Sequence, residues 1–377
     1  MKKAGIYIHI PFCAVKCMYC DFYSIADQND QIPSFIEALI KEIKISKMLP
    51  EDRIFDTVFI GGGTPSLIEA KFLERIISAL DKKFDLSNVN EFTIEANPGE
   101  APKERLKDFL SLGINRLSIG VQSLHPHLLS FLTRIHDATQ VFTTFENARS
   151  VGFQNISCDL IYSIPGQTWS MWEKDLRKII SLQPNHISAY TLTVEKGTSL
   201  FELVRNRKVK MPIDDETGKW FLDTHKILEE SGYPGYEISN FGSLDMQCKH
   251  NLHYWRIDPY MAFGPSAHGF DGQRRWNNTR SLNNYFQKIK SNEKPISTTE
   301  NLSDLDLVNE ALGFGLRMKE GFNISLIPNQ HLKIFDKKYK KIKKEYPKLI
   351  YDREKRIFLT IKGMLLSDQI IPELLFE

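Results

Sequence analysis

The sequence predicts an α/β fold in which parallel strands alternate with helices. Three observations support this: six short runs of mostly β-branched and aromatic residues, longer amphipathic stretches between them, and a glycine triplet directly after the second run. Strand–helix units in series favour parallel strands with helical crossovers, as in a doubly wound sheet or a barrel. In both folds, functional residues are expected at the C-terminal ends of the strands.

The strands are expected over residues 5–10, 57–60, 92–96, 116–120, 156–161 and 186–192. The helices between them are expected over residues 34–48, 67–84, 103–112, 139–151 and 169–182. The first of these helices is predicted because its apolar residues recur at the spacing of one helical stripe: Phe35, Ile36, Leu39, Ile40 and Ile43.

The pattern changes near residue 233. Residues 233–272 are rich in Gly, Pro, His and aromatic side chains, and we expect an ordered, irregular cap or a short sheet within residues 233–300. A helical pattern returns after residue 301, followed by a basic segment (337–348), a β-hairpin over 349–359 and a short terminal helix. The sequence therefore divides into 1–232, 233–300 and 301–377.

Composition limits the classes of partner. The net charge is +2, from 49 basic and 47 acidic residues, which gives no long-range attraction for nucleic acid. The basic segment is therefore interpreted as a solvated helix face. No apolar run reaches the roughly 18 residues of a transmembrane helix. Five cysteines, three of them within eight residues, favour a reducing compartment, the cytoplasm, and a metal site.

Those three cysteines form the most informative motif. Cys13, Cys17 and Cys20 make a C-x3-C-x2-C loop, whose thiolates suit an iron–sulfur cluster. A [4Fe–4S] cube held by three ligands keeps one iron open for chemistry, as catalytic zinc sites keep one position open. The alternatives are a structural metal site or three unrelated thiols, but zinc would usually require a fourth ligand nearby. Cys158, in an apolar run, is interpreted as a core thiol.

Polar residues follow four consecutive predicted strands. The turn Gly61-Gly62-Gly63-Thr64-Pro65 lets backbone amides approach a ligand, although a tight turn explains it equally well. Glu95 ends the third strand, where it suits ribose hydroxyls, an amino group or a helix cap. Gln122 and then Arg134 follow the fourth, and Asp159 lies within the fifth, where an unpaired charge is costly. Together they predict one pocket mouth.

With these motifs, the chain resembles radical S-adenosylmethionine (SAM) proteins of the oxygen-independent coproporphyrinogen III oxidase-like group. The cysteine motif marks the superfamily, and the group is matched by residues 7–13, the GGGTP turn, residues 120–122 and residues 159–162. The resemblance covers essentially the whole chain. It implies a partial (β/α)6 TIM-like barrel, the radical SAM core, followed by a small C-terminal winged-helix-like α/β module.

The resemblance also implies the cofactors. A [4Fe–4S] cluster on the three cysteines would bind SAM through its open iron, and one-electron reduction would cleave SAM to a 5′-deoxyadenosyl radical. The residues that would line the SAM site are Tyr7, Tyr19, Gly62, Gly63, Thr64, Glu95, Gln122, Arg134 and Asp159.

Three features separate the members of the group. The oxidases carry a further cysteine two positions after the third cluster cysteine, where this chain has Phe22, and a sizeable segment ahead of the cluster, whereas Cys13 is already near the start here. His250-Asn251-Leu252-His253-Tyr254-Trp255 resembles the H-N-x-x-Y-W signature of HemW-type haem chaperones. Histidine is a common haem ligand, and aromatic rings can pack on porphyrin.

His250 is the predicted haem ligand, with His253, Cys248 and His268 as alternatives. Without the resemblance, two histidines in an irregular loop would more often be ordinary surface or core groups. The resulting hypothesis is a cytoplasmic haem chaperone that binds the cluster, SAM and haem and delivers haem to a respiratory haem protein. Peripheral membrane association, a homodimer and SAM turnover stay open.

Two enzymes are the alternatives. A coproporphyrinogen III oxidase would convert two propionates to vinyl groups by radical decarboxylation. A nucleic-acid-modifying radical SAM enzyme would bind RNA or DNA with strong salt dependence, which the charge balance does not favour.

Overall fold

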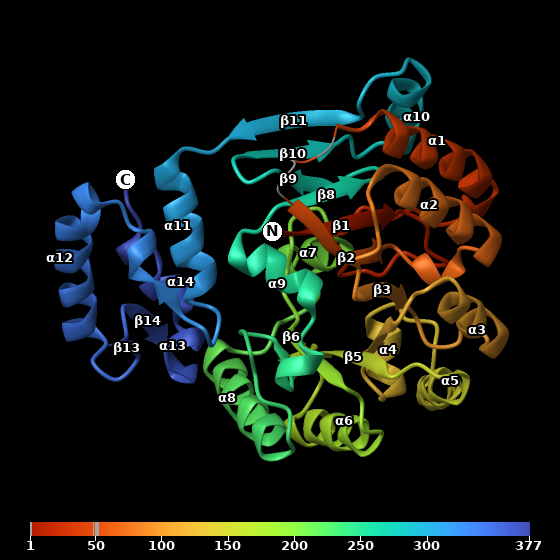
Figure 1. Cartoon of the computed structure of the whole chain (residues 1–377). Coiled ribbons are helices and arrows are strands. Elements are labelled where there is room, and N and C mark those ends of the chain that lie inside the picture. Colours follow the sequence, from red (N-terminus) through yellow and green to blue (C-terminus); the bar gives the residue numbers. More distant parts are fainter. Residues whose placement is uncertain (1, 48, 50–52) are drawn as a thin grey trace.

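One long sheet organises the molecule. A computed structural model describes residues 2–47, 49 and 53–377. The strands of this sheet follow the order β11-β10-β9-β8-β1-β2-β3-β4-β5-β6-β7. The helices that connect β1 to β6 cover the outer side of the sheet (Figure 1). The six predicted strands are confirmed, and they are parallel: β1 (Lys2–Ile10), β2 (Arg53–Gly62), β3 (Glu91–Ala96), β4 (Arg116–Gln122), β5 (Asn155–Tyr162) and β6 (His186–Thr191).

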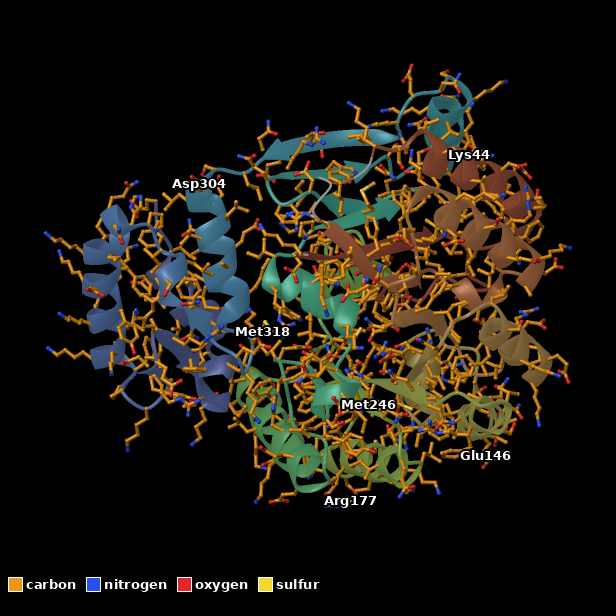
Figure 2. The ribbon with its side chains drawn as sticks, in the orientation of Figure 1. Lys44, Glu146, Arg177, Met246, Asp304 and Met318 are labelled. Carbon is orange, nitrogen blue, oxygen red and sulfur yellow. The ribbon has the colours of Figure 1, made fainter. Side chains whose placement is uncertain are left out.

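The outer layer consists of helices whose apolar stripes pack on the sheet. Lys44, Glu146 and Arg177 lie on its solvent side (Figure 2). The five predicted helices are present, although Met48, the last residue expected in the first of them, lies outside the described residues. The five are α1 (Ile32–Ile45), α2 (Ala70–Lys83), α3 (Lys103–Ser111), α5 (Ala138–Val151) and α6 (Trp169–Ser181). Also present, but not predicted, are α4 (Pro126–Phe131), α7 (Ser199–Arg205) and α8 (Asp214–Glu230).

Local sequence explains these elements. Strand β1 is buried over most of its length, with Ile6, Ile8 and Ile10 fully buried, as expected for a strand in a parallel sheet that is covered on both faces. In α1 the buried side chains form the predicted stripe. Helix α5 begins with a capping box between Asp137 and Gln140.

The sheet continues beyond residue 233 at both edges. β7 (Asn240–Gly242) pairs antiparallel with β6, whereas β8 (Tyr260–Phe263) pairs parallel with β1. Antiparallel strands β9 (His268–Phe270), β10 (Arg274–Asn278) and β11 (Ile296–Asn301) follow, with α10 (Leu282–Lys290) between the last two. The expected cap is thus largely an extension of the main sheet.

The prediction of irregular structure around His250 is wrong. Residues Lys249–Arg256 form helix α9. The two carboxylate oxygens of Glu91 accept hydrogen bonds from the backbone N–H groups of Lys249 and His250, each at 2.9 Å. Free N–H groups at a helix start need such acceptors, and here the acceptor comes from a distant strand that no local pattern reveals.

The C-terminal residues form a compact module. Its helices are α11 (Asp304–Gly315), α12 (Asn329–Glu345), α13 (Ile361–Leu365) and α14 (Ser367–Ile370), and its sheet has the order β12-β14-β13, formed by β12 (Phe322–Asn323), β13 (Ile350–Arg353) and β14 (Arg356–Leu359). The predicted hairpin and terminal helix are confirmed. The winged-helix-like assignment stays a prediction.

Helix α9 lies between this module and strands β1 and β2 of the main sheet (Figure 1). The Trp255 ring packs edge-on against Phe314 of α11, with ring centroids 5.8 Å apart. Tyr236, Leu252 and Met318 form a small buried cluster beside it. Within the described residues, no helix is long and apolar enough to cross a membrane.

Candidate functional site

The three predicted cluster cysteines lie on a compact loop after β1. Two backbone hydrogen bonds close this loop: Cys13 N to Ile25 O at 2.9 Å, and Ile25 N to Pro11 O at 2.8 Å. The Cys13 side chain is buried, Cys17 and Cys20 are partly exposed, and all three are free thiols. The loop therefore presents three unpaired thiols at the C-terminal end of the first strand.

The surroundings of these thiols fit an iron–sulfur cluster. Thr64 Oγ1 donates to Cys13 Sγ at 3.5 Å, and Arg134 Nη1 donates to Cys17 Sγ at 3.6 Å. Hydrogen bonds donated to the sulfur atoms are one of the factors that set the reduction potential of such clusters. Burial raises the pKa of Cys13, and that of Cys20 to about 11, so bound iron would be needed to hold them as thiolates.

The three thiols are not arranged as ligands of a single metal ion. Across residues 2–47, 49 and 53–377, no three His, Cys, Asp or Glu side chains converge as ligands of a single ion. A cube does not require such convergence, because each of its irons takes its own thiolate. The donor set is therefore consistent with a three-ligand cluster.

The glycine turn packs directly against the cysteine loop. Gly63 N donates to Ile10 O and Thr64 N donates to Phe12 O, both at 2.7 Å. A Cβ added to Gly63 would lie 2.5 Å from Phe12 O and 3.0 Å from Cys13 Sγ. Only glycine fits this approach, so the tight turn also supports the cysteine loop.

A hydrogen-bond network joins the end of β4 to two of the cluster sulfurs. Arg134 Nη2 donates to Gly120 O at 2.7 Å and to Asn97 Oδ1, and Asn97 Nδ2 donates to Thr64 Oγ1 at 3.0 Å. Sequence reasoning missed Asn97. Its position two residues after Glu95, at the same strand end, is the signal that could have identified it.

A cavity of about 570 Å³ opens inside the curved sheet. This volume is typical of small-molecule and cofactor sites. Four predicted SAM residues line it: Tyr7, Gly62, Glu95 and Asp159. The other five, which are not among its lining residues, are Tyr19, Gly63, Thr64, Gln122 and Arg134.

The two carboxylates in this cavity are held differently. Glu95 Oε2 accepts from the backbone N–H of Gly62 at 2.9 Å, and burial raises the pKa of Glu95 to about 8. Asp159 instead accepts three hydroxyl hydrogen bonds at 2.6–3.0 Å, from Ser118, Ser157 and Ser188. These hydroxyls replace water around the charge, which makes a carboxylate tolerable within a strand.

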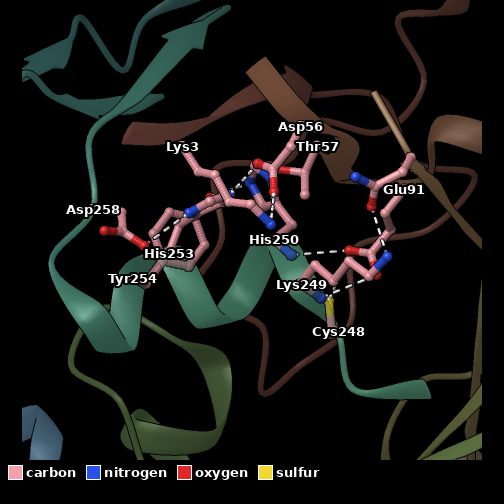
Figure 3. Close-up of polar contacts among 11 residues, drawn as sticks. Lys3, Asp56, Thr57, Glu91, Cys248, Lys249, His250, His253, Tyr254 and Asp258 are labelled. Atoms are coloured by element: carbon pink, nitrogen blue, oxygen red, sulfur yellow. Dashed lines mark hydrogen bonds and ion pairs between the residues drawn. The ribbon is translucent and has the colours of Figure 1, made fainter. Parts of the chain in front are cut away.

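His250 is in the wall of the same cavity, together with Asn251 and Tyr254. The imidazole is fully buried, with Nδ1 2.9 Å from Thr57 Oγ1 and Nε2 2.8 Å from the Tyr254 hydroxyl (Figure 3). Burial lowers the pKa of His250 well below its ordinary value, so the ring is neutral at pH 7. Neutral imidazole is the form that binds metals.

Helix α9 lines the cavity near the N-terminal halves of the strands, away from the strand end that carries the cysteine loop. His250 contacts Gly5 and Thr57, which lie in the N-terminal halves of β1 and β2, and the α9 cap Glu91 is the first residue of β3. The expectation that functional residues gather at the C-terminal strand ends therefore fits the cysteines, but not the H-N-x-x-Y-W segment.

The alternative haem ligands are placed less favourably. His253 lies between Asp56 and Asp258, at 2.8 and 3.1 Å, and Lys3 pairs with Asp56 at 3.2 Å (Figure 3). Although burial lowers the pKa of His253, Asp258 and Asp56 raise it to about 9, so the ring is a cation that ties α9 to the sheet.

The thiol of Cys248 is buried beside Glu91, at 3.7 Å from Oε1. His268 is the one alternative that lines the cavity, and its side chain is exposed. The structure therefore leaves two of the four candidates, His250 and His268, facing the cavity.

Known proteins of similar sequence cover the whole chain. Residues 7–179 match the Radical SAM superfamily. The Heme chaperone HemW of Lactococcus lactis subsp. lactis is 34% identical over 378 residues, which span 100% of this chain and 98% of that protein. The Heme chaperone HemW of Bacillus subtilis is also 34% identical, over 100% of both chains.

The fold has a full-length counterpart among solved structures. The coproporphyrinogen III oxidase HemN from Escherichia coli has a TM-score of 0.85, with 23% identity over 99% of this chain and 90% of that chain. At this identity the likeness shows a common fold. Sequence identity along the full length is what decides membership, and this chain belongs to the HemW family of radical SAM proteins.

Proposed function

We propose that this protein is a cytoplasmic haem chaperone that binds a [4Fe–4S] cluster and SAM, holds haem in its central cavity and delivers it to a respiratory haem protein. One observation carries the proposal. A single cavity is lined by residues of the predicted SAM site, including Tyr7 and Glu95, and by His250, Asn251 and Tyr254 of the signature segment. Relatives at 34% identity carry the name Heme chaperone.

At the cluster end, each residue has a separate task. Cys13, Cys17 and Cys20 would hold the cluster, which when bound supplies one-electron chemistry and an open iron for SAM. Thr64 and Arg134 donate hydrogen bonds to two of the sulfurs. The Gly63 turn keeps the loop in place by close contact.

At the other end, His250 is prepared to bind iron through Nε2. Thr57 Oγ1 is 2.9 Å from Nδ1 and fixes the orientation of the ring, as the hydrogen-bond partners of metal-binding histidines do. The ring is neutral because it is buried. Ligation requires the Tyr254 hydroxyl, now 2.8 Å from Nε2, to move aside.

The experiment is an absorbance titration of the cluster-reconstituted full chain with haemin. The wild-type protein is compared with His250→Ala, His268→Ala and the control His127→Ala, whose side chain is exposed on α4. We expect His250→Ala alone to lose the histidine-ligated Soret band. The proposal fails if wild-type protein binds haemin no better than an unrelated protein, and the His250 assignment fails if His250→Ala binds it unchanged.

An enzyme assay separates the chaperone from the oxidase. The same preparation is incubated anaerobically with SAM, a reductant and coproporphyrinogen III, and 5′-deoxyadenosine is measured as the control for an active cluster. The chaperone predicts unchanged porphyrin in a preparation that passes this control. Formation of protoporphyrinogen would contradict the proposal and establish the oxidase.

A further inference from the structure

The cavity contains one buried cation that the proposed site does not use. Arg116, the first residue of β4, lines the cavity and is only 2% exposed. Its Nε has no hydrogen-bond partner among the residues that the structure describes. An unpartnered guanidinium nitrogen is unusual at this depth, because a buried donor without an acceptor costs free energy.

The carboxylates of Glu91 and Asp159, which influence Arg116, already accept hydrogen bonds from other groups, and none from Arg116 is found among the described residues. Both oxygens of Glu91 accept from the first N–H groups of α9, and Asp159 accepts from three serine hydroxyls. Burial alone would lower the pKa of Arg116, but acidic neighbours, chiefly Cys248 and Glu91, raise it. The group is therefore a fixed positive charge with free hydrogen-bonding capacity.

The neighbouring imidazole offers no competing site. His186 also lines the cavity, but its Nδ1 lies 2.8 Å from Ser157 Oγ and its Nε2 lies 2.9 Å from the Tyr236 hydroxyl. Both ring nitrogens are thus paired. Arg116, whose Nε has no partner among the described residues, therefore offers a donor to an incoming ligand in this part of the wall.

We propose that Arg116 anchors a carboxylate of the ligand that occupies this cavity. The planar guanidinium donates pairs of parallel hydrogen bonds to carboxylates, and such charge-assisted bonds are strong where water is excluded. This inference rests on the proposed function, under which the carboxylate is a propionate of haem. The carboxylate of SAM is the other source of the same chemistry, and the experiment separates the two.

The test compares haemin with haemin dimethyl ester, in which both propionates are neutral. Each is titrated into the full chain from the same solvent stock. We expect wild-type protein to bind the diacid about 10- to 100-fold more tightly than the ester. Arg116→Gln should lose this preference, Arg116→Lys should restore part of it, and Arg177→Gln, on the outer face of α6, should retain it fully.

Each outcome has a distinct meaning. If wild-type protein binds neither form, the proposed function fails. If haemin binds but the ester binds equally well, or if Arg116→Gln keeps the preference, only the carboxylate anchor is overturned. The wild-type comparison needs no substitution, so poor folding of a variant does not obscure it. Equilibrium dialysis with SAM forms the last arm, and loss of SAM binding alone in Arg116→Gln would overturn the propionate assignment.

Discussion

The Nε2 atom of His250 lies 2.8 Å from the hydroxyl oxygen of Tyr254, one helical turn further along α9. This contact occupies the nitrogen that haem iron would need. This hydrogen bond must break before haem iron can bind. The apparent affinity for haem is therefore the intrinsic affinity multiplied by the fraction of molecules in which Nε2 is free.

Tyr254→Phe should therefore bind haem more tightly than wild-type protein. Because the lost hydrogen bond is worth about 1 kcal/mol, we expect up to a ~5-fold lower dissociation constant in a haemin titration. Tyr260→Phe, on the same cavity wall, is the control. Unchanged or weaker binding in Tyr254→Phe would show that Nε2 is not the ligating atom.

His253 makes stability depend on pH. Its pKa of about 9 in the folded protein lies above the ordinary value of 6.5. Its contribution is therefore fully present below pH 6.5 and is lost as the pH rises through about 9. We expect His253→Gln to lower the free energy of unfolding by on the order of 2 kcal/mol at pH 6, and by progressively less up to pH 10. Urea unfolding at several pH values measures this, and a difference independent of pH would refute it.

Gly63→Ala should weaken the cluster site. The added Cβ would lie 2.5 Å from Phe12 O, so the turn and the cysteine loop must separate. We expect a cost of roughly 1–3 kcal/mol in stability and loss of most cluster absorbance after reconstitution. Gly313→Ala in α11 is the matched control: its Cβ would meet its nearest neighbour at 3.9 Å, and a helical Gly→Ala change stabilises by up to about 1 kcal/mol. Equal iron content in both variants would contradict the prediction.

Arg134→Gln should change the cluster's potential without removing the cluster. The substitution deletes the donor 3.6 Å from Cys17 Sγ and a nearby positive charge. In the wild-type protein, this donor and this charge stabilise the reduced cluster, which is the more negative state. Their removal should therefore lower the midpoint potential by on the order of 50 mV. Spectroelectrochemical titration measures this at unchanged iron content. A potential equal to that of Arg177→Gln would rule out a role for Arg134 at the cluster.

Sequence reasoning predicted most of the fold, and it singled out the residues at one end of the candidate site, whose roles stay predictions. The strands are short runs rich in β-branched and aromatic residues, and polar residues near their C-terminal ends, such as Glu95 in β3, mark positions that the fold brings together. Helix α9 was not predictable from local pattern because its N-terminal acceptor, Glu91, lies 159 residues before His250. Arg116 was missed for a related reason, because within a predicted strand its charge gives no sign that it faces a cavity.

Iron-edge anomalous diffraction from crystals of cluster-reconstituted protein with bound haem tests the central claim most directly. We predict two separate iron positions, one beside the thiols of Cys13, Cys17 and Cys20, and one within bonding distance of Nε2 of His250 inside the cavity. A haem iron outside the cavity, or bound to another side chain, would contradict the account.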